Sequence, residues 1–526
     1  MKKNNLIIIF LFVINLLNAQ IKFQNAYGGV GSDNGKFVVQ TSDNGYVIAG
    51  TTTSFGEGGR DVYVLKTSAT GALLWTKTFG GATDNEYGFS VQQTADGGYI
   101  ISGVASSFSD VAGDMYLIKL NADGDLTWSK TYGGIGYEWG AAIKQTTDGG
   151  YIVTGQTPAF GAGGFDAYLI KLDDSGIIEW TKTYGGSGLE VASGVSQTAD
   201  GGYIIIGEID SFGAGSGDIL LIKTDAGGNQ TWAKAIGTAD NEEALEVKQT
   251  PDGGYIIAGS GYGVQTLSRD MFLIKTNSLG NITWAKTYGS IVNDQCESAI
   301  LTNDGGYILC GYSFGFTTDA NYQAYVVKTD ATGNTMWSKT YGGSSVNGDF
   351  GRSIQQTNDN GYIITGETFS FGDGFFNVYL IKTDSLGDSG CHQGNAATIT
   401  SNKVFQSMDP PIVSSSGGIA TDPATVVHEG GTQTNLCEIL AIESEIFNTN
   451  KVQVYPNPFT DIVTIDLKDF PGVTSVTILD IMGKSLRTFE LTSRSTSINL
   501  ATLKSGIYLC QLKGNTTTEI IKIIKR

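Results

Sequence analysis

The sequence predicts an all-β protein: a seven-bladed β-propeller of four-stranded blades, closed by the N-terminal strand, and a small C-terminal Ig-like β-sandwich. A strand of the form GGYI recurs seven times, at intervals of 52 to 55 residues. Each repeat reads as four short strands that alternate or run β-branched, without the 3.6-residue period of a helix. This period and strand number are typical of propeller blades, with a β-solenoid as the alternative. The recurring tyrosines are Tyr46, Tyr99, Tyr151, Tyr203, Tyr255, Tyr307 and Tyr362.

Residues 1–19 are expected to be a signal peptide. Two lysines precede an apolar run from Leu6 to Leu17, and Ala19 stands before Gln20. The run is too short for the ~30 Å hydrocarbon core of a membrane, so a cleaved export signal is favoured over an anchor. No later segment approaches 18 apolar residues, and the mature chain is expected to lack a transmembrane segment.

Residues 20–388 hold the repeats, and the two ends of this region indicate how the ring closes. The hairpin LIKTDxxGxxxWxK carries its tryptophan six times, whereas the seventh copy continues into DSGCHQG. The lone strand from Ile21 to Gly29 has Phe23 in the tryptophan position and no hairpin before it. It can therefore complete the seventh blade, which removes the free edges of a solenoid. The six tryptophans are Trp75, Trp128, Trp180, Trp232, Trp284 and Trp337.

The LIKTDATGNTMW hairpin resembles the tryptophan-bearing hairpin of quinoprotein-type propellers. The resemblance implies that the strand ending in VQQT is the innermost of each blade and that the WxK strand is the outermost. It extends only over turn and packing residues, so it implies no quinone, and no organic cofactor is expected.

Residues 389–451 are expected to be a Ser/Thr/Gly-rich linker that contains a disulfide. Cysteines of an exported chain are commonly oxidised, and Cys391 and Cys437 flank this segment outside the repeats. We therefore predict that these two residues are bridged. Cys296 and Cys310 lie on adjacent strands of one repeat and are predicted to be buried free thiols.

Residues 452–526 differ from the repeats and read as short alternating strands that end in EIIKIIKR. This segment resembles the type A sorting domain of the type IX secretion system. The resemblance implies recognition by that machinery, translocation across the outer membrane, and release or attachment at the cell surface; the alternative is an ordinary Ig-like module. The match rests on Tyr455, Pro456, Asn457 and Pro458, on the DIMGK turn at 480–484, on Gly506 with Tyr508, and on the basic tail from Lys522 to Arg526.

The composition excludes several classes of function. Lys and Arg number 33 against 52 Asp and Glu, which gives a net charge of −19. Nucleic acid is therefore not an expected partner, because phosphate binding needs a basic surface. The two histidines, His392 and His428, both lie outside the repeats. A His-based catalytic triad or a multi-histidine zinc site within the propeller is thereby excluded.

A carboxylate stands seven residues before the end of every innermost strand, and a small residue follows two positions later. Both positions are expected to face the central channel, with the acids around one mouth. Such a ring could bind Ca²⁺ or another hard cation. The favoured alternative is structural: each acid accepts backbone N–H bonds or pairs with a repeated lysine such as Lys77. The seven acids are Asp33, Glu86, Glu138, Glu190, Glu242, Asp294 and Asp349.

Ligand specificity is expected where the repeat is broken. The position after each acid shares nothing between blades; Trp139 stands there in one blade, and it is the only tryptophan outside the WxK position. Aromatic rings beside carboxylates can stack on a sugar ring while its hydroxyls are hydrogen-bonded. The alternative is that the rings fill gaps between blades. The candidate ligand-binding residues are Tyr87, Tyr137, Trp139 and Phe350.

These observations favour a secreted or cell-surface binding or adhesion propeller without catalytic residues, with a glycan, a protein or a mineral surface as ligand. One alternative is a hydrolase or lyase that acts on polysaccharides. The KTYGG and DGGYI repeats are similar to those of proteins loosely grouped with endoglucanases, but no glycosidase motif is present. A structural surface-layer protein is the other alternative.

Overall fold

The structure, a computed structural model, describes residues 20–109, 113–265, 268–316, 321–372, 374–437, 452–457, 459–467, 475–479, 485–491, 493–504, 506–513 and 518–525. Its contacts divide the chain into two units, Met1–Ile439 and Leu440–Arg526, which are treated separately below. The predicted signal peptide lies outside the described residues. Within the described part of the chain, no helix is long and apolar enough to cross a membrane.

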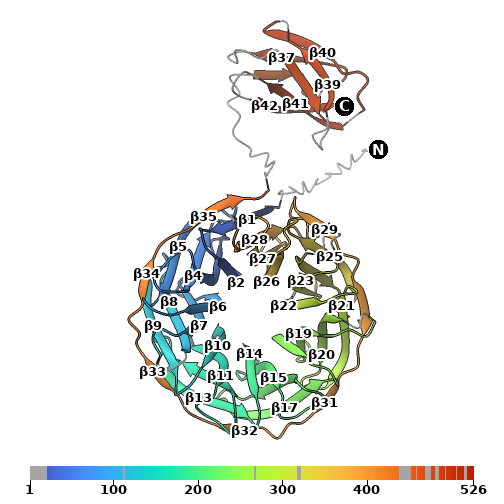
Figure 1. Cartoon of the computed structure of the whole chain (residues 1–526). Helices are drawn as coiled ribbons and strands as arrows, with labels where there is room; N and C mark the ends of the chain where they lie inside the picture. Colours follow the sequence, from blue (N-terminus) through green and yellow to red (C-terminus); the bar gives the residue numbers. More distant parts are fainter. Residues whose placement is uncertain are drawn as a thin grey trace, which may run out of the picture. The chain divides into compact units, whose positions relative to one another are not determined.

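The first unit is the predicted seven-bladed propeller, with seven antiparallel sheets arranged around a central channel (Figure 1). The first four strands of each blade run from the channel outward. The innermost strands are β2 (Asp33–Gln40), β6 (Glu86–Gln93), β10 (Trp139–Gln145), β14 (Glu190–Gln197), β18 (Glu243–Gln249), β22 (Asp294–Leu301) and β26 (Asp349–Gln356). The second strands are β3 (Tyr46–Thr52), β7 (Tyr99–Ala105), β11 (Tyr151–Thr157), β15 (Tyr203–Ile209), β19 (Tyr255–Tyr262), β23 (Tyr307–Ser313) and β27 (Tyr362–Thr368).

The third strand carries the YLIK sequence and the fourth carries the WxK sequence, in the order that the sequence predicts. The third strands are β4 (Asp61–Thr67), β8 (Asp114–Leu120), β12 (Asp166–Leu172), β16 (Asp218–Thr224), β20 (Arg269–Thr276), β24 (Gln323–Thr329) and β28 (Asn377–Thr383). The fourth strands are β5 (Leu73–Gly80), β9 (Leu126–Gly133), β13 (Ile178–Gly185), β17 (Gln230–Gly237), β21 (Ile282–Gly289), β25 (Thr335–Tyr341) and, from the N-terminus, β1 (Phe23–Gly28).

The ring closes as predicted, because β1 is the fourth strand of the seventh blade. It pairs antiparallel with β28, with Ala26 opposite Tyr379. The same aromatic contact then seals every boundary between blades: the Trp75 ring of blade one lies 5.9 Å from the Tyr99 ring of blade two. At the closing boundary Phe23 takes the place of tryptophan, 6.1 Å from Tyr46. Phe23 therefore replaces the tryptophan of the other blades in the contact that closes the ring.

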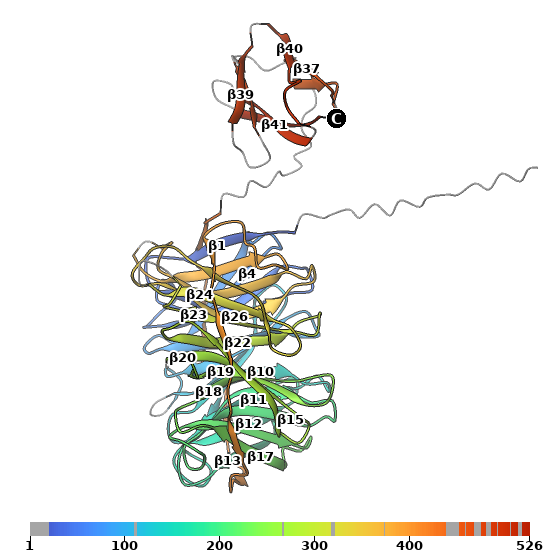
Figure 2. The ribbon, with the colours of Figure 1, turned by 90° about the vertical axis from the view of Figure 1, so that its right-hand side faces the viewer.

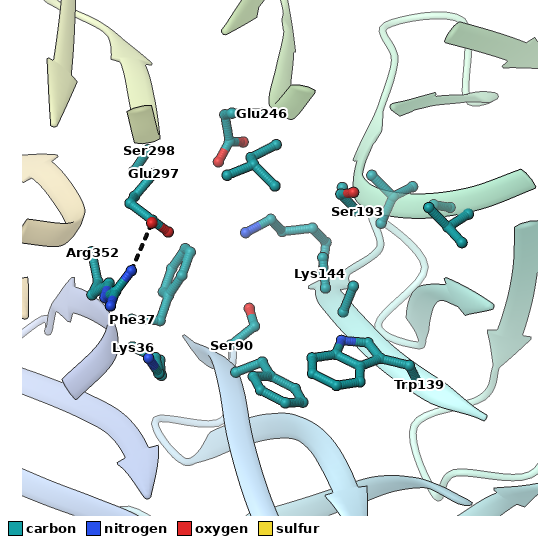
Figure 3. A pocket seen from close by; sticks show the side chains of 18 of the residues that line it. Lys36, Phe37, Ser90, Trp139, Lys144, Ser193, Glu246, Glu297, Ser298 and Arg352 are labelled. Carbon is teal, nitrogen blue, oxygen red and sulfur yellow. Dashed lines mark hydrogen bonds and ion pairs between the residues drawn. The ribbon is translucent and has the colours of Figure 1, made fainter. Parts of the chain in front are cut away.

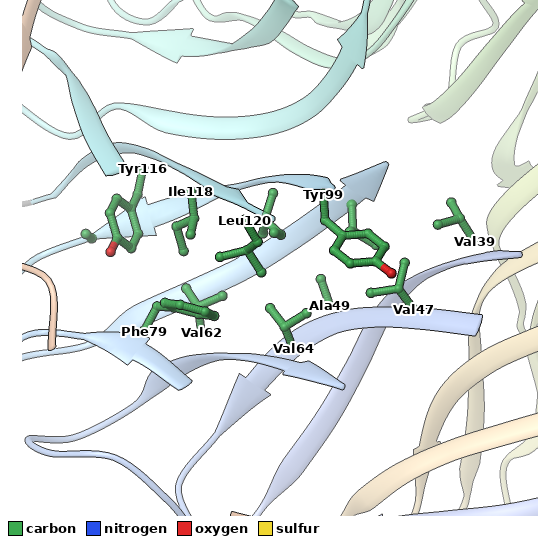
Figure 4. Packing of buried hydrophobic residues seen from close by; sticks show 13 residues of the cluster. Val39, Val47, Ala49, Val62, Val64, Phe79, Tyr99, Tyr116, Ile118 and Leu120 are labelled. Carbon is green, nitrogen blue, oxygen red and sulfur yellow. The ribbon is translucent and has the colours of Figure 1, made fainter. Parts of the chain in front are cut away.

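The hydrophobic core lies between the blades. In one boundary, buried apolar side chains of β3 and β4 pack against those of β7 and β8 (Figure 4). Facing sheets bury the alternate residues of each strand, and both faces of the two middle strands are covered. The strands β3 and β4 are therefore buried along their whole length, which explains their runs of Val, Ile, Leu and Tyr.

Each blade has a fifth strand, so the prediction of four-stranded blades and of a linker at 389–451 needs correction. Residues 393–435 form seven short strands that follow the rim of the propeller, one per blade (Figures 1 and 2). We call this segment the belt. It visits the blades in reverse chain order and returns to β1. Its strands are β29 (Gln393–Asn395), β30 (Ile399–Asn402), β31 (Gln406–Met408), β32 (Val413–Ser415), β33 (Ile419–Thr421), β34 (Val426–His428) and β35 (Thr432–Asn435).

The belt matches the side chains of the blade beneath it. In four blades the hydroxyl of a third-strand tyrosine bonds to the belt: Tyr168 Oη donates to Gly417 O at 2.7 Å, for example, and Tyr116 Oη lies 2.6 Å from Thr425 Oγ1. In the seventh blade, Tyr379 Oη donates instead to Gln24 of β1. Where that strand has Phe272 instead, the belt supplies Phe405, 5.4 Å away between ring centroids. The belt contact is thus polar or apolar according to the residue that the blade presents, which favours one register of the belt.

The ends of the belt meet beside β1 and are joined covalently. Cys391 and Cys437, the predicted pair, form a disulfide with their Cα atoms 5.8 Å apart. Cys296 and Cys310 are free and buried. Residues 391–437 therefore begin and end beside β1 after one circuit of the propeller.

The second unit is the predicted small sandwich. Its three-stranded sheet is β36-β37-β40 and its four-stranded sheet is β39-β38-β41-β42. Apolar residues of both sheets, among them Val463, Ile478 and Leu512, form its core. The strands are β36 (Val452–Tyr455), β37 (Ile462–Leu467), β38 (Ser475–Leu479), β39 (Ser485–Glu490), β40 (Ser495–Asn499), β41 (Gly506–Lys513) and β42 (Thr518–Lys525).

Candidate functional site

The seven predicted ring acids are fully buried and hold the crossing from one blade to the next. In the second blade, Glu86 Oε2 accepts a hydrogen bond from Gly81 N at 2.9 Å, just beyond the fourth strand of the first blade. Its Oε1 accepts from Ser107 N at 3.0 Å. These N–H groups would otherwise be unsatisfied in a tight loop. The geometry supports the structural role, and the acids do not stand open at the channel mouth.

A second carboxylate accompanies the ring acid at five of the seven boundaries, and in four of them, Asp61, Asp166, Asp218 and Asp270, it is buried. Asp61, at the start of β4, points at Gly80 together with Glu86, and a Cβ on Gly80 would lie within 2.6 Å of both carboxylates. Burial and the neighbouring Glu86 raise the pKa of Asp61 to about 7. At the two remaining boundaries an amide replaces this aspartate, as Gln323 and Asn377.

Among the described residues, the repeated lysines of the WxK strands do not pair with these acids; the lysine that does is Lys403, 3.1 Å from Glu242 Oε1. Lys77, on the WxK strand, pairs instead with Glu429 of the belt at 2.5 Å, and Lys130 pairs with Asp422 at 2.6 Å. Among the described residues, no group of three or more His, Cys, Asp or Glu could hold a metal ion. Ca²⁺ binding stays a prediction of the sequence alone.

The small residues two positions after each acid face the neighbouring blade rather than the channel axis. A Cβ on Gly88 would lie 2.6 Å from Gly50 O, and one on Gly35 would lie 2.5 Å from Thr365 Oγ1. The residues are small because the adjacent sheet approaches closely. The expectation that they crowd around the axis is therefore wrong.

A β-bulge explains the difference and creates the channel wall. In every innermost strand the pairing skips the residue three positions after the acid, as between Gly88 and Ser90. A bulge leaves one residue unpaired and turns its side chain, and bulges recur beside binding sites for that reason. All seven bulge residues line one cavity of about 640 Å³ in the channel (Figure 3). They are Lys36, Phe89, Ala141, Ser193, Leu245, Glu297 and Arg352.

One side of the cavity is aromatic, and of the four predicted ligand-binding residues Trp139 lines it, with Tyr87 and Tyr137 beside it. Trp139 is 36% exposed and stacks on Phe89, with ring centroids 4.4 Å apart and planes at 16°. Tyr87 is parallel to Phe89 at 6.3 Å, and Tyr137 lies 6.0 Å from Trp139. Two neighbouring blades therefore stack Tyr87, Phe89 and Trp139 nearly parallel, whereas the Tyr137 ring is tilted by 57° against Trp139.

The fourth predicted residue, Phe350, belongs to a separate aromatic cluster. Its ring contacts Tyr312 at 4.9 Å and Tyr322 at 5.3 Å, and the Arg352 guanidinium lies 5.4 Å from its centroid. Phe350 does not line the cavity. Its role in the structure is to pack the loops of the sixth and seventh blades and to support Arg352.

The side of the cavity around Arg352 is charged. Arg352 Nη1 donates to Glu297 Oε1 at 2.6 Å, and its Nε donates to Glu367 Oε1 at 2.8 Å. Lys36 Nζ lies 2.9 Å from the same Glu367 oxygen. Burial opposes the charge on Glu367, but Arg352 and Lys36 hold its pKa below the ordinary value. This side is thus a compact, internally paired network.

Lys144 lies near the end of β10 and reaches into the middle of the cavity (Figure 3). Its Nζ lies 5.0 Å from the Phe37 ring centroid. The loss of water around it, together with the nearby Lys248, lowers the pKa of Lys144 to about 8, although Glu246 opposes the shift.

Sequence reasoning missed Phe89, Lys144 and the charged network, although it located the correct strands. The detectable signal was the residue three positions after each acid, which shares nothing between blades. In a regular strand, side chains alternate between the two faces, and this alternation places the residue in the channel only if a bulge interrupts the strand. No sequence motif marks the bulge in these strands.

The sorting motif is partly described. Asn457 Oδ1 accepts a hydrogen bond from Ile524 N at 2.8 Å, and Lys525 Nζ lies 3.2 Å from Asp461 Oδ1. The opening motif therefore binds the last strand, β42. Pro458 and the turn at 480–484 lie outside the described residues.

Comparison with known proteins identifies the C-terminal unit. Residues 453–526 match the family of secretion system C-terminal sorting domains. This confirms the type IX sorting domain expected from the sequence, and such a domain directs export to the extracellular space or the cell surface. The comparison with curated proteins found no match.

Two solved structures are similar to the chain at low identity. One is the extracellular domain of what is described as a hybrid two component system from B. thetaiotaomicron: 9% identity, 94% of this chain, 69% of that chain, TM-score 0.28. The other is an endo-1,5-alpha-L-arabinanase from Thermotoga petrophila RKU-1: 10% identity, 68% of this chain, 100% of that chain, TM-score 0.23.

Proposed function

We propose that the protein is an exported glycan-binding propeller, without catalysis of its own, that holds its ligand at the central channel. The observation that carries the proposal is Trp139, an exposed ring at a cavity, stacked flat on Phe89 of the neighbouring blade. Flat aromatic rings bind the apolar face of a sugar. The packing against Phe89 fixes the ring before any ligand arrives, which lowers the entropic cost of binding.

Polar groups around the cavity can bind sugar hydroxyls. Ser193 and Gln156 line it, and the buried hydroxyl of Ser90 has no hydrogen-bond partner among the residues that the structure describes. A mixed apolar and polar lining with a volume of about 640 Å³ is typical of small-ligand sites. These groups would select the orientation of a sugar stacked on Trp139.

The test is Trp139→Ala in the mature exported protein, assayed on a glycan array and by titration with the strongest ligand. We expect at least a tenfold loss of affinity with a small change in Tm. Trp139→Phe is the matched control and should keep most of the affinity, because it preserves a ring on Phe89. Unchanged retention with a lowered Tm would mean that the rings only fill space between blades.

A hydrolase is the second candidate, and Glu297 is the observation in its favour. Burial raises the pKa of Glu297 above its ordinary value, as a general acid requires, although Arg352 opposes the shift. However, Glu297 is paired with Arg352 and Glu246 is paired with Lys248. Carboxylates held in ion pairs are poorly suited to donate a proton, and this favours a binding protein over a hydrolase. Release of reducing ends from polysaccharides, abolished by Glu297→Gln, would establish the hydrolase.

A further inference from the structure

We propose that the ligand of the channel is an acidic glycan, whose uronic-acid carboxylate pairs with Lys144 while another sugar of the same glycan chain stacks on Trp139. The inference rests on the proposed glycan-binding function and names the class of glycan. It follows from an imbalance of charge inside the cavity and from the placement of the two residues on one strand.

Lys144 is the cation of the cavity without a partner. Among the described residues, its Nζ has no hydrogen bond and no ion pair, and its contact is the face of the Phe37 ring. The other cations around the cavity are paired. Those pairs are Arg352 with Glu297 and Glu367, Lys36 with Glu367, and Lys248 with Glu246.

Lys144 is half-buried, and an ammonium group that has lost part of its water is unfavourable unless an anion meets it. The same surroundings make an arriving anion bind more strongly than it would in water, because the local dielectric constant is low. The chain as a whole carries −19, so long-range attraction does not bring a polyanion to the protein. The attraction is local, and it acts on a carboxylate that has entered the channel.

Trp139 and Lys144 are placed for an oligosaccharide rather than for a single sugar. Both belong to β10, with Trp139 at its start and Lys144 one residue before its end. Five residues of strand span roughly 16 Å at about 3.3 Å per residue. If one sugar stacks on Trp139 at the start of the strand, the carboxylate that pairs with Lys144 therefore belongs to a later unit of the same glycan chain.

The experiment compares trimers that differ only in their C6 carboxylates. Titration of the mature protein with trigalacturonate and trimannuronate is set beside galactotriose and mannotriose. We expect at least one acidic trimer to bind ten times more tightly than its neutral counterpart, with the difference reduced by added salt. Lys144→Met should remove the preference for the acidic trimer.

Two further variants separate charge from structure. Lys144→Arg keeps the charge and should keep most of the preference. Lys182→Met removes a lysine that contacts Asn229 on the outer part of the ring, and it should change nothing. The salt dependence of the wild-type protein tests the same charge if Lys144→Met lowers Tm.

Three outcomes would overturn the inference. Equal binding of acidic and neutral trimers contradicts the role of Lys144 while the glycan-binding function stands. A preference for acidic trimers that survives Lys144→Met places the carboxylate elsewhere and also overturns it. If no glycan on the array depends on Trp139, the proposed function fails and the inference fails with it.

Discussion

The rim and the channel of this propeller are built from the same repeat, yet they differ in what the blades share. At the rim, each boundary repeats a ring contact such as that of Trp75 with Tyr99, and each blade accepts one belt strand. In the channel, the bulge residues are Lys, Phe, Ala, Ser, Leu, Glu and Arg, one from each blade.

The difference separates structural requirements from binding. A contact that recurs at every boundary does something that every boundary needs, which is to hold two sheets together. A position that differs in every blade is free of that requirement and can form an asymmetric surface. Changes at the rim should therefore alter stability alone, and changes in the channel should alter binding alone.

The largest effect is expected from the double substitution Cys391→Ser and Cys437→Ser. The bridged residues are 46 apart, and chain-entropy theory assigns such a loop about 4 kcal/mol. We expect the free energy of unfolding, measured in denaturant, to fall by about that amount. Glycan affinity at low denaturant should not change. An unchanged free energy of unfolding would mean that the belt is held by its blade contacts alone.

Trp128→Ala should lower the free energy of unfolding by about 3 kcal/mol, because it removes a large ring from a packed boundary. The Trp128 ring lies 6.2 Å from Tyr151 of the next blade. The variant should bind glycans like the wild type, which is the reverse of the result expected for Trp139→Ala. A loss of affinity in folded Trp128→Ala protein would contradict the separation of rim and channel.

Affinity for an acidic trimer should fall by about tenfold, or about 1.4 kcal/mol, as the pH rises from 7 to 9. The pKa of Lys144 is lowered to about 8, so the ammonium is present below that pH and lost above it. The trimer carboxylates stay ionised throughout. The other charged groups at the cavity are Lys36, Lys248, Glu246, Glu297 and Arg352. Neutral trimers and the Lys144→Met variant should show no such step.

The smallest effect is a gain of stability from Asp61→Asn. The pKa of Asp61 is raised to about 7 in the folded protein, so its ionised form is disfavoured there. Stability from the protonated group is present below the unfolded pKa of about 4 and is lost as the pH rises through about 7. The variant should therefore gain about 1 kcal/mol at pH 8 and nothing at pH 4. Asn377 already occupies this position in another blade.

Much of the propeller could be predicted because contacts that recur in every blade require the same residues at the same position of every repeat. Trp75, Tyr99 and their equivalents recur at a fixed interval, and Phe23 identified the strand that closes the ring. The belt could not be predicted in this way. Its strands are three or four residues long and mostly exposed, so they carry no alternation of apolar and polar residues.

The candidate site was half predictable for a related reason. Trp139 stood out because tryptophan is otherwise confined to one position of the repeat. Lys144 and Arg352 did not, because a lysine or arginine on a strand is ordinary and the bulge that turns Arg352 inward has no sequence signature. Phe350 shares the position of Trp139 in its own blade, but neighbouring rings occupy the space around it.

The disulfide that joins the ends of the belt gives the first unit an unusual topology. Residues 391–437 form a closed covalent hoop, and the seven blades lie inside it. The blades are thus surrounded by a covalently closed loop of the same chain. No boundary between blades can open wide in the oxidised protein unless the hoop stretches, so the covalent backbone itself opposes the splaying of the blades.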